Sequence, residues 1–311
     1  MPSVSIVLIF LDEERFLEEA VQSVRDQTLT DWELILVDDG STDRSTEIAR
    51  EAAALDDRIR YVDHPGHQNR GMAASRNFGA AHATAPYVGF FDGDDVLVPT
   101  KLAEQVEVLD SMPDVAMVNG AILHWHSWNS SADGAVDTVV LGGGADERLD
   151  PPDTALTLYP LGRRDGPAVD LMVRRSVFDE LGGFEESFRG LYEDQSFKIK
   201  VFMRYPIYIS SHVWLHYRQH DASACAQVSP REYLRLRGIF LDWVQDEVDQ
   251  VGDPRVSRAL RHARRRLRLN RLMAPVVERV MPPMEELRYR IPDQIKTPVK
   301  RGLRRMRLPT A

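Results

Sequence analysis

Three carboxylates lie within four residues of this chain, directly after two aromatic residues. Residues 90–95 read Phe-Phe-Asp-Gly-Asp-Asp, so Asp92, Asp94 and Asp95 follow an apolar run at residues 87–91. Like charges this close repel one another unless a cation neutralises them. Ligands that are all oxygen suit a hard divalent ion, which in proteins commonly also holds substrate phosphates. We therefore predict Mn2+ or Mg2+ as the cofactor and a substrate that carries a diphosphate.

Acidic residues also follow two other apolar runs. Asp12 comes after residues 3–10, and Asp38 and Asp39 come after residues 32–37. Runs that are apolar at nearly every position are typical of strands buried on both faces of a parallel sheet. Such sheets bind their ligands beyond the carboxyl ends of the strands. We therefore expect these carboxylates to share one site with the first cluster.

The elements that must position these residues alternate between strand and helix, as in an α/β protein with a mostly parallel central sheet. Up to residue 109 the patterns predict strands at 3–10, 32–37, 59–62 and 87–91, and helices at 13–27, 42–55, 72–83 and 99–109. Further on they predict strands at 116–124, 170–173, 206–210 and 214–218, and helices at 175–181, 195–204 and 230–251. Residues 127–152 are polar and rich in Gly and Asp, which predicts a long loop of the kind that forms functional lids.

The composition favours a soluble globular protein: of 311 residues, 43% are hydrophobic and 28% are charged. The apolar run at residues 4–11 is too short for a signal peptide, and no stretch approaches the length of a membrane span. The single cysteine, Cys225, excludes an internal disulfide and indicates a reducing compartment. We therefore expect a cytoplasmic protein.

Charge is distributed unevenly around the net value of -9. Residues 1–252 hold 22 Lys and Arg against 43 Asp and Glu, whereas residues 253–311 hold 17 against 5. In the basic tail, Leu and Met alternate with Arg at helical spacing, which suits a helix lying on anionic lipid. A solvated helical appendage that packs on the acidic domain is an equally good interpretation. Nucleic acid is not an expected partner, because no recognised binding fold accompanies the charge.

Six motifs occur in one order along residues 3–225. They are Ser-Ile-Val-Leu at 5–8, Val-Asp-Asp-Gly-Ser-Thr-Asp at 37–43, Asn-Arg-Gly at 69–71 with Arg76, Asn77 and Gly79, Phe-Asp-Gly-Asp-Asp at 91–95, Gly-Gly-Phe at 182–184, and Glu-Asp at 193–194. Each motif alone is weak, but the ordered set strongly resembles glycosyltransferase family 2. The resemblance implies an inverting enzyme with the GT-A fold, a Rossmann-like sheet flanked by helices.

The resemblance also implies roles for single residues. Asp39 would hydrogen-bond the base of the donor, and Arg76 would brace the nucleotide and the acidic cluster. Asp92, with Gly93 beside it, would contact the ribose side, and Asp94 would bind the metal ion. The catalytic base would be Asp194. An inverting transfer does need one carboxylate to deprotonate the acceptor hydroxyl, and a cation to stabilise the departing diphosphate.

Supporting roles fall to residues next to these. Asp95 belongs to the acidic cluster, and Glu193 is able to raise the pKa of its neighbour. The segment 216–223 resembles a later family segment that closes over the diphosphate. His220 is therefore a second candidate for the metal or phosphate contact, with Arg218 beside it.

One departure from the family affects the base. Many members carry Pro-Thr-Tyr-Asn after the first strand, with an aromatic ring that packs on the base. This chain has Ile-Phe-Leu-Asp at residues 9–12. Either Phe10 or Leu11 takes that place, or the base packs differently.

Structural explanations compete with the functional ones. Asp38 and Asp39 form an ordinary turn and helix cap as readily as a ligand site. Glu193 and Asp194 stand where a helix dipole favours acidic residues. Trp125 and Trp128 suit core or lid packing better than sugar platforms, and His124 with His126 suits a surface or cleft pair better than a metal pair.

Together these observations predict a metal-dependent inverting glycosyltransferase of polysaccharide biosynthesis, with a UDP-sugar as the default donor. The acceptor would be a hydroxyl of a glycan, a lipid-linked intermediate or a small molecule. We expect a GT-A domain at 1–225, with its nucleotide part at about 1–125 and its acceptor part at 126–225, and a helical basic extension at 226–311. The extension would allow peripheral contact at the inner face of the membrane.

Two rivals remain. A sugar-nucleotide nucleotidyltransferase would use a similar sheet and acidic site, but it needs a basic triphosphate pocket near the first strand, where residues 12–14 are acidic. A non-catalytic protein that binds a sugar nucleotide or a membrane would keep its function without Asp194.

Overall fold

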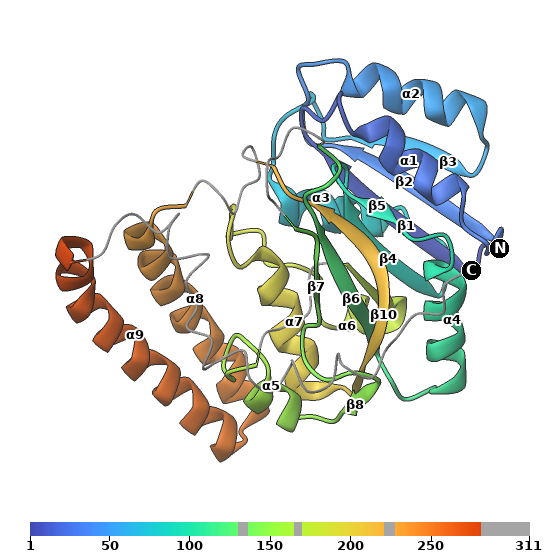
Figure 1. Cartoon of the computed structure of the whole chain (residues 1–311). Coiled ribbons are helices and arrows are strands. Elements are labelled where there is room, and N and C mark those ends of the chain that lie inside the picture. The colour runs from blue at the N-terminus through green and yellow to red at the C-terminus, as the bar shows by residue number, and fades with distance from the viewer. Residues whose placement is uncertain (130–135, 165–169, 221–227, 281–311) are drawn as a thin grey trace. The chain divides into compact units, whose positions relative to one another are not determined.

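The computed structural model of the chain describes residues 1–129, 136–164, 170–220 and 228–280 (Figure 1). The chain divides into two compact units, residues 1–264 and residues 265–311, and each is considered by itself. The predicted domain boundary at 225 falls outside the described residues.

The elements follow one another in this order: β1 (Val4–Phe10), α1 (Leu17–Arg25), β2 (Trp32–Asp38), α2 (Ser45–Leu55), β3 (Ile59–Asp63), α3 (Met72–Ala81), β4 (Tyr87–Asp92), β5 (Val96–Leu97), α4 (Lys101–Ser111), β6 (Met117–Trp125), β7 (Thr138–Val140), β8 (Glu147–Leu149), α5 (Asp153–Thr157), β9 (Leu171–Arg174), α6 (Arg175–Glu180), α7 (Glu193–Arg204), β10 (Ile207–Arg218), α8 (Pro230–Val251) and α9 (Pro254–Val280).

One mixed sheet runs through the first unit in the order β3-β2-β1-β4-β9-β6-β10-β5, with β7 paired to β6 and β8 paired to β10. The first four strands in this order, β3, β2, β1 and β4, are parallel. Beyond them β9 is antiparallel to both β4 and β6, whereas β10 is parallel to β6. The expected α/β fold, a Rossmann-like sheet flanked by helices, is confirmed.

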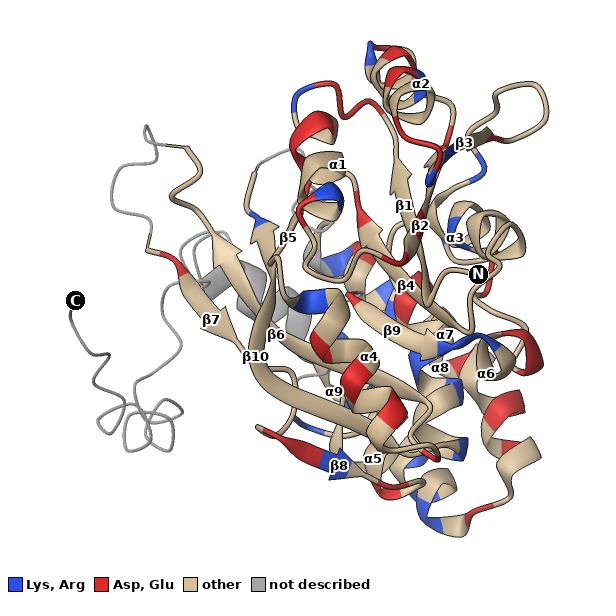
Figure 2. Cartoon of the chain, turned by 90° about the vertical axis from the view of Figure 1, so that its right-hand side faces the viewer, with Lys and Arg blue, Asp and Glu red and all other residues tan. Residues whose placement is uncertain are grey.

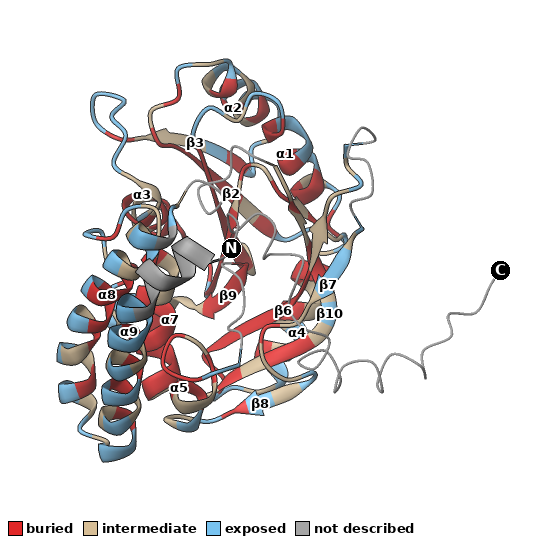
Figure 3. Ribbon diagram, turned by 60° about the vertical axis from the view of Figure 1, so that its left-hand side comes forward, coloured by how far each residue is buried: buried red, intermediate tan, exposed pale blue. Residues whose placement is uncertain are grey.

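Helices cover both faces of the sheet, and its central strands are buried between them (Figure 3). Alternate residues of β1 point to opposite faces, as the two-residue period of a strand requires. Ile6 and Leu8 join a core cluster that also holds buried side chains of α1, α2 and α4. Val7 points the other way, toward α3. Both faces of β1 are thus apolar, which explains its unbroken run of hydrophobic residues.

Gly79 lets α3 lie close to the sheet. A Cβ atom at Gly79 would come within 2.4 Å of Val7 Cγ1 and 2.8 Å of Val37 Cγ2, distances that force the strand side chains to move. We expect Gly79→Ala to lower the free energy of unfolding by about 1–3 kcal/mol, because it overpacks a dense interface. Urea unfolding followed by circular dichroism would measure the loss.

Gly89 in β4 provides a matched control for this substitution. A Cβ atom there would meet its nearest neighbour, the carbonyl oxygen of Leu171, at 3.8 Å, which is ordinary contact. Gly89→Ala should therefore leave the unfolding midpoint near that of the parent chain. Equal stability of the two variants would contradict the close packing of α3.

Three local expectations were wrong, and one short strand was missed. The predicted strands 206–210 and 214–218 form one strand, β10, whose register with β6 shifts twice between Ile209 and Leu215. Residues 127–152 contain the strands β7 and β8, which pair with longer strands. Helix α1 begins at Leu17, because residues 13–16 form a turn in which the Glu13 carbonyl oxygen accepts the backbone N–H of Phe16. The two-residue strand β5 was too short to be predicted.

The helix that begins after Ser229 was predicted correctly. The Ser229 side chain accepts a hydrogen bond from the backbone N–H of Glu232 at 3.2 Å, and proline opens the helix. α8 then runs to Val251, and Gly252 closes it in a left-handed conformation. Among the described residues, no helix is both long enough and apolar enough to cross a bilayer.

Candidate active site

The carboxyl ends of β1, β2 and β4 lie next to one another. Phe10 pairs with Asp38 on β2, and Ile9 pairs with Asp92 on β4. The loop that leaves β1 toward α1 is strongly acidic (Figure 2). The predicted convergence of the carboxylates at this edge of the sheet is therefore present, but the individual side chains do different things.

Asp12 and Asp38 stabilise the backbone. The Asp38 carboxylate accepts hydrogen bonds from the backbone N–H groups of Gly40 at 3.1 Å and Ser41 at 2.7 Å, and from the Thr46 hydroxyl at 2.5 Å. Asp12 accepts the backbone N–H of Thr42 at 2.6 Å. For Asp38 the explanation as a turn is correct, but in the described structure no N-cap side chain caps α2.

Asp39 fastens the end of β2 to the loop before α3. Its carboxylate accepts the backbone N–H of Arg70 at 2.7 Å and that of Gly71 at about 3 Å, and it lies 3.8 Å from His64 Nε2. Only 4% of Asp39 is exposed. The carboxylate thereby sets the conformation of the loop before α3. Oδ1 accepts from both N–H groups, whereas Oδ2 accepts from Gly71 and keeps a lone pair for a further donor.

Phe10 and Leu11 differ in exposure. Phe10 is 3% exposed and belongs to the core cluster, whereas Leu11 is 39% exposed at the end of β1. Of the two, Leu11 is the side chain open to a nucleotide base. Gly93 allows the chain to turn beside Phe10, because a Cβ atom there would lie 2.9 Å from Phe10 Cβ.

Arg76 joins the end of β4 to the start of α7. Its Nη2 donates to Asp92 Oδ1 at 2.7 Å, and its Nη1 lies 3.8 Å from Glu193 Oε1. The guanidinium is 1% exposed, and its Nε and Nη1 have no hydrogen-bond partner in the described structure. Burial raises the pKa of Asp92 against the opposing effect of Arg76. The site is thus strongly acidic and only partly neutralised.

The two acidic residues that open α7 have different environments. Burial raises the pKa of Glu193 to about 7, and the charge of Asp194 adds to the rise. Burial would also raise the pKa of Asp194, but the Lys198 ammonium, at 2.5 Å from Asp194 Oδ2, overcomes it and holds that pKa below its usual value. Lys198 is fully buried. Near neutral pH, Asp194 is therefore ionised, whereas Glu193 is close to half protonated.

Asp94 and His220 are in direct contact. His220 Nε2 lies 2.9 Å from Asp94 Oδ2, and this hydrogen bond raises the pKa of His220. Glu13 lies near this pair and was not selected from the sequence. Burial raises the pKa of Glu13 to about 8, and the negative charge of Asp94 adds to this rise. No group of three or more His, Cys, Asp or Glu is arranged as metal ligands within the described ranges.

The side chains available as metal ligands suit a divalent ion that substrate phosphates help to hold. Mg2+ and similar ions commonly take one or two protein ligands and complete their coordination with phosphate oxygens and water. Asp94 offers a carboxylate and His220 an imidazole at one point of the site. Asp92 does not join them, since Arg76 holds its carboxylate.

Arg218 fixes the loop that carries the acidic cluster. Its backbone N–H donates to Asp95 Oδ1 at 2.9 Å, and its Nε donates to the Asp94 carbonyl oxygen at 2.7 Å. The guanidinium also lies 4.6 Å from the ring centres of Phe16 and Trp125 and 5.1 Å from that of Trp128. The packing role expected for the two tryptophans is therefore the observed one.

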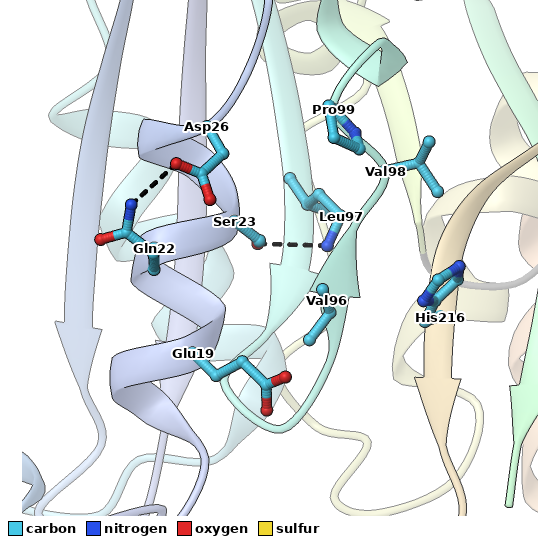
Figure 4. Close-up of a pocket in the computed structure, with 9 residues that line it drawn as sticks. All are labelled: Glu19, Gln22, Ser23, Asp26, Val96, Leu97, Val98, Pro99 and His216. Atoms are coloured by element: carbon cyan, nitrogen blue, oxygen red, sulfur yellow. Dashed lines mark hydrogen bonds between the residues drawn. The ribbon is translucent and has the colours of Figure 1, made fainter. Parts of the chain in front are cut away.

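A cavity of about 350 Å³ lies behind this loop, between α1, β5 and β10 (Figure 4). It is lined by Glu19, Gln22, Ser23, Asp26, His216 and residues 96–99. Glu19 also accepts Arg218 Nη2 at 2.6 Å. None of the predicted site residues lines this cavity, so it is distinct from the acidic site.

Two residues of the site, Lys198 and Glu13, were not selected from the sequence. Only one of them stands at a spacing that could have identified it. Lys198 stands four residues after Asp194, a spacing that brings side chains together on a helix. That pair was therefore visible in the sequence. Glu13 depends on the path of the loop after β1, for which no pattern was available.

Comparisons with known proteins agree with this geometry. Residues 5–133 match the family model described as Glycosyl transferase family 2. Over 111 residues the chain is 43% identical to the uncharacterized glycosyltransferase EpsJ of Bacillus subtilis (strain 168). The matched segment covers 34% of this chain and 31% of that relative. The chain spans less than half the length of the first curated relatives it matches.

Solved structures share the fold at low identity. S. aureus TarS 1-349 in complex with UDP-GlcNAc superposes with a TM-score of 0.61 at 18% identity, over 78% of this chain and 66% of that chain. The mannosyltransferase PcManGT from Pyrobaculum calidifontis, in complex with GDP-Man and Mn2+, gives 0.52 at 19% identity, over 86% and 70%.

Proposed function

Residues 5–133 belong to glycosyl transferase family 2, and from this premise we propose that the chain is an inverting glycosyltransferase. It would move a sugar from a nucleotide-diphosphate sugar to an acceptor hydroxyl. The observation that carries the proposal is the contact network of Arg76, which brings the end of β4 together with the acidic start of α7. A donor site and a candidate base thereby meet.

The proposed reaction is a single displacement. Asp194 takes the proton of the acceptor hydroxyl while that oxygen attacks the anomeric carbon and the bond to the diphosphate breaks. Its carboxylate is ionised near neutral pH, as a base must be, and Lys198 fixes its position. Arg76 and Asp92 orient the ribose side of the donor, and Asp39 and Leu11 lie where the base would bind.

The donor diphosphate would carry its divalent ion to Asp94 and His220. A bound Mn2+ or Mg2+ stabilises negative charge on a leaving diphosphate. Arg218 and Asp95 hold the backbone of this loop in place. UDP is the default nucleotide of the donor, and GDP is the alternative. The two solved structures are in complex with a UDP-sugar and a GDP-sugar respectively.

The acceptor belongs to the class of glycans, lipid-linked intermediates or small molecules of polysaccharide biosynthesis. We place the enzyme in the cytoplasm. Its basic tail is proposed to reach the inner face of the membrane by charge attraction to anionic lipid.

Thermal unfolding with nucleotide diphosphates and their sugars, each with and without Mn2+, tests the donor. Binding to the folded state raises the melting temperature, so one base should raise it most, and only with the ion. A shift with nucleoside triphosphates alone would favour a nucleotidyltransferase. No shift with any nucleotide would overturn the proposal.

Asp94→Asn is expected to remove the effect of Mn2+ on nucleotide binding, because an amide is a much weaker ligand than a carboxylate. His220→Gln should weaken the effect of Mn2+ less, since the charged ligand, Asp94, remains. Titration calorimetry of the nucleotide with and without Mn2+ would measure both. Asp137→Asn is the control, because that carboxylate bonds only the loop at Ser127 and the backbone of His126. Full ion dependence in Asp94→Asn would exclude Asp94 as a ligand.

A further inference from the structure

Arg237, in the first half of α8, is a buried arginine for which the described residues provide no counter-ion. Arg237 is 8% exposed, and its Nη2 donates to the carbonyl oxygen of Pro160. Its Nη1 has no hydrogen-bond partner, and no carboxylate in the described ranges pairs with it. A buried charge is costly unless it is paired. This guanidinium is therefore suited to accept an anion that the described residues do not supply.

Three tyrosine hydroxyls meet beside this arginine. Tyr159 OH donates to Tyr192 OH at 3.0 Å and lies 3.4 Å from Tyr233 OH. Arg237 Cζ lies 4.7 Å from the ring centre of Tyr159 and 5.7 Å from that of Tyr192. We call these four residues the tyrosine–arginine cluster.

The cluster has a hydrogen to donate. Because Tyr159 donates to Tyr192, Tyr233 is the donor in the second contact, and the Tyr192 hydrogen is the one that these two contacts do not use. Tyr233 is 41% exposed, which opens the hydroxyl end to solvent. Phenol hydroxyls and a guanidinium both donate to oxyanions, and such charge-assisted bonds are strong.

The position of the cluster connects it to the acceptor side. Tyr192 directly precedes Glu193 and adopts a left-handed conformation with φ of 73°, which is strained for a residue with a side chain. Its ring stacks on Phe240 of α8, 4.6 Å between centres. α7 and α8 lie side by side (Figure 1). Because Tyr192 is the residue before α7, the cluster stands at the end of α7 that carries Asp194.

We propose that the tyrosine–arginine cluster binds an oxyanion of the acceptor, a phosphate or a carboxylate, and so selects anionic acceptors. This deepens the proposed function and rests on it. The anion would occupy the free side of the Arg237 guanidinium, and the hydroxyls of the cluster would complete its hydrogen bonds.

The test uses small oxyanions on the full chain. The donor site is first filled with the nucleotide diphosphate and Mn2+ that stabilise the chain most, so that a phosphate probe is excluded there. Glycerol 1-phosphate, glucuronate and glucose are then titrated by calorimetry. We expect at least one of the two anions to bind and neutral glucose not to bind. A preference between the anions distinguishes a phosphate-bearing acceptor from a uronic acid.

Variants assign this binding to the cluster. Arg237→Met should weaken the anion by about tenfold or more, as expected for loss of a charged donor. Arg235→Met removes an equal charge two residues away, from an exposed arginine that pairs with Glu232, and should change nothing. If Arg237→Met does not fold, the conservative Tyr233→Phe decides, since it must also weaken the anion.

Two results would overturn the proposal: neither anion binds, or Arg237→Met binds the anion as well as Arg235→Met does. Both results are distinguishable from failure of the proposed function. If the proposed function fails, no nucleotide stabilises the parent chain in the first place.

Discussion

Asp194→Asn is expected to lower the rate of sugar transfer by about 10²- to 10⁴-fold, the usual contribution of a general base. The amide keeps the shape of the side chain but cannot take the proton of the acceptor hydroxyl. Nucleotide affinity should not change, because the residues proposed to bind the donor lie on other elements. Transfer at saturating donor, with calorimetry of the nucleotide, would measure both quantities.

The substitution also removes the carboxylate that forms an ion pair with the buried Lys198 ammonium. Loss of fold must therefore be separated from loss of catalysis. The double variant Asp194→Asn with Lys198→Met removes both members of the pair and should recover stability without recovering transfer. Asp246→Asn, an exposed position on α8, serves as the neutral control.

A different outcome would assign the base to the neighbouring residue. If Asp194→Asn still transfers sugar and Glu193→Gln does not, Glu193 is the base. Its pKa of about 7 would then appear as a rise in rate through neutral pH. With Asp194 as the base, whose pKa is lowered, the rate should not depend on its ionisation near neutrality.

The sequence placed the acidic residues at one edge of the sheet because hydrophobic patterns show where strands end. Asp38 and Asp39 are equivalent in such a pattern. They differ in the structure because Asp38 bonds its own turn, whereas Asp39 bonds a loop about thirty residues away. That loop reaches Asp39 only through the tertiary fold, so local patterns could not separate the two roles.

The same distinction applies to the cations of the site. Lys198 stands one helical turn from Asp194, and the spacing alone was sufficient to suggest the pair. Arg218 stacks against rings from the segments before α1 and after β6. Such long-range packing leaves no periodic signal, and the family resemblance identified Arg218 only as a neighbour of His220.

Arg76→Met is expected to lower the free energy of unfolding by about 3–5 kcal/mol, the usual cost of breaking a buried ion pair. Arg76 is the cation within ion-pair distance of both Asp92 and Glu193. Methionine fills a similar volume, so the lost charge would dominate the effect. Urea unfolding at pH 7 would measure it. Arg44→Met, at a pair with Glu47 that is largely exposed, should leave the unfolding midpoint close to that of the parent chain.

The pH dependence identifies the cause of this loss. Without Arg76, the folded-state pKa values of Asp92 and Glu193 would rise further above their unfolded values, because burial and mutual repulsion already raise them. A carboxyl with a raised folded-state pKa destabilises the fold once the pH exceeds its unfolded value, and protonation relieves the cost. The gap between Arg76→Met and the parent chain should therefore be widest above pH 7 and should narrow toward pH 5. A gap that does not change with pH would mean that Arg76 stabilises the fold by packing rather than by its charge.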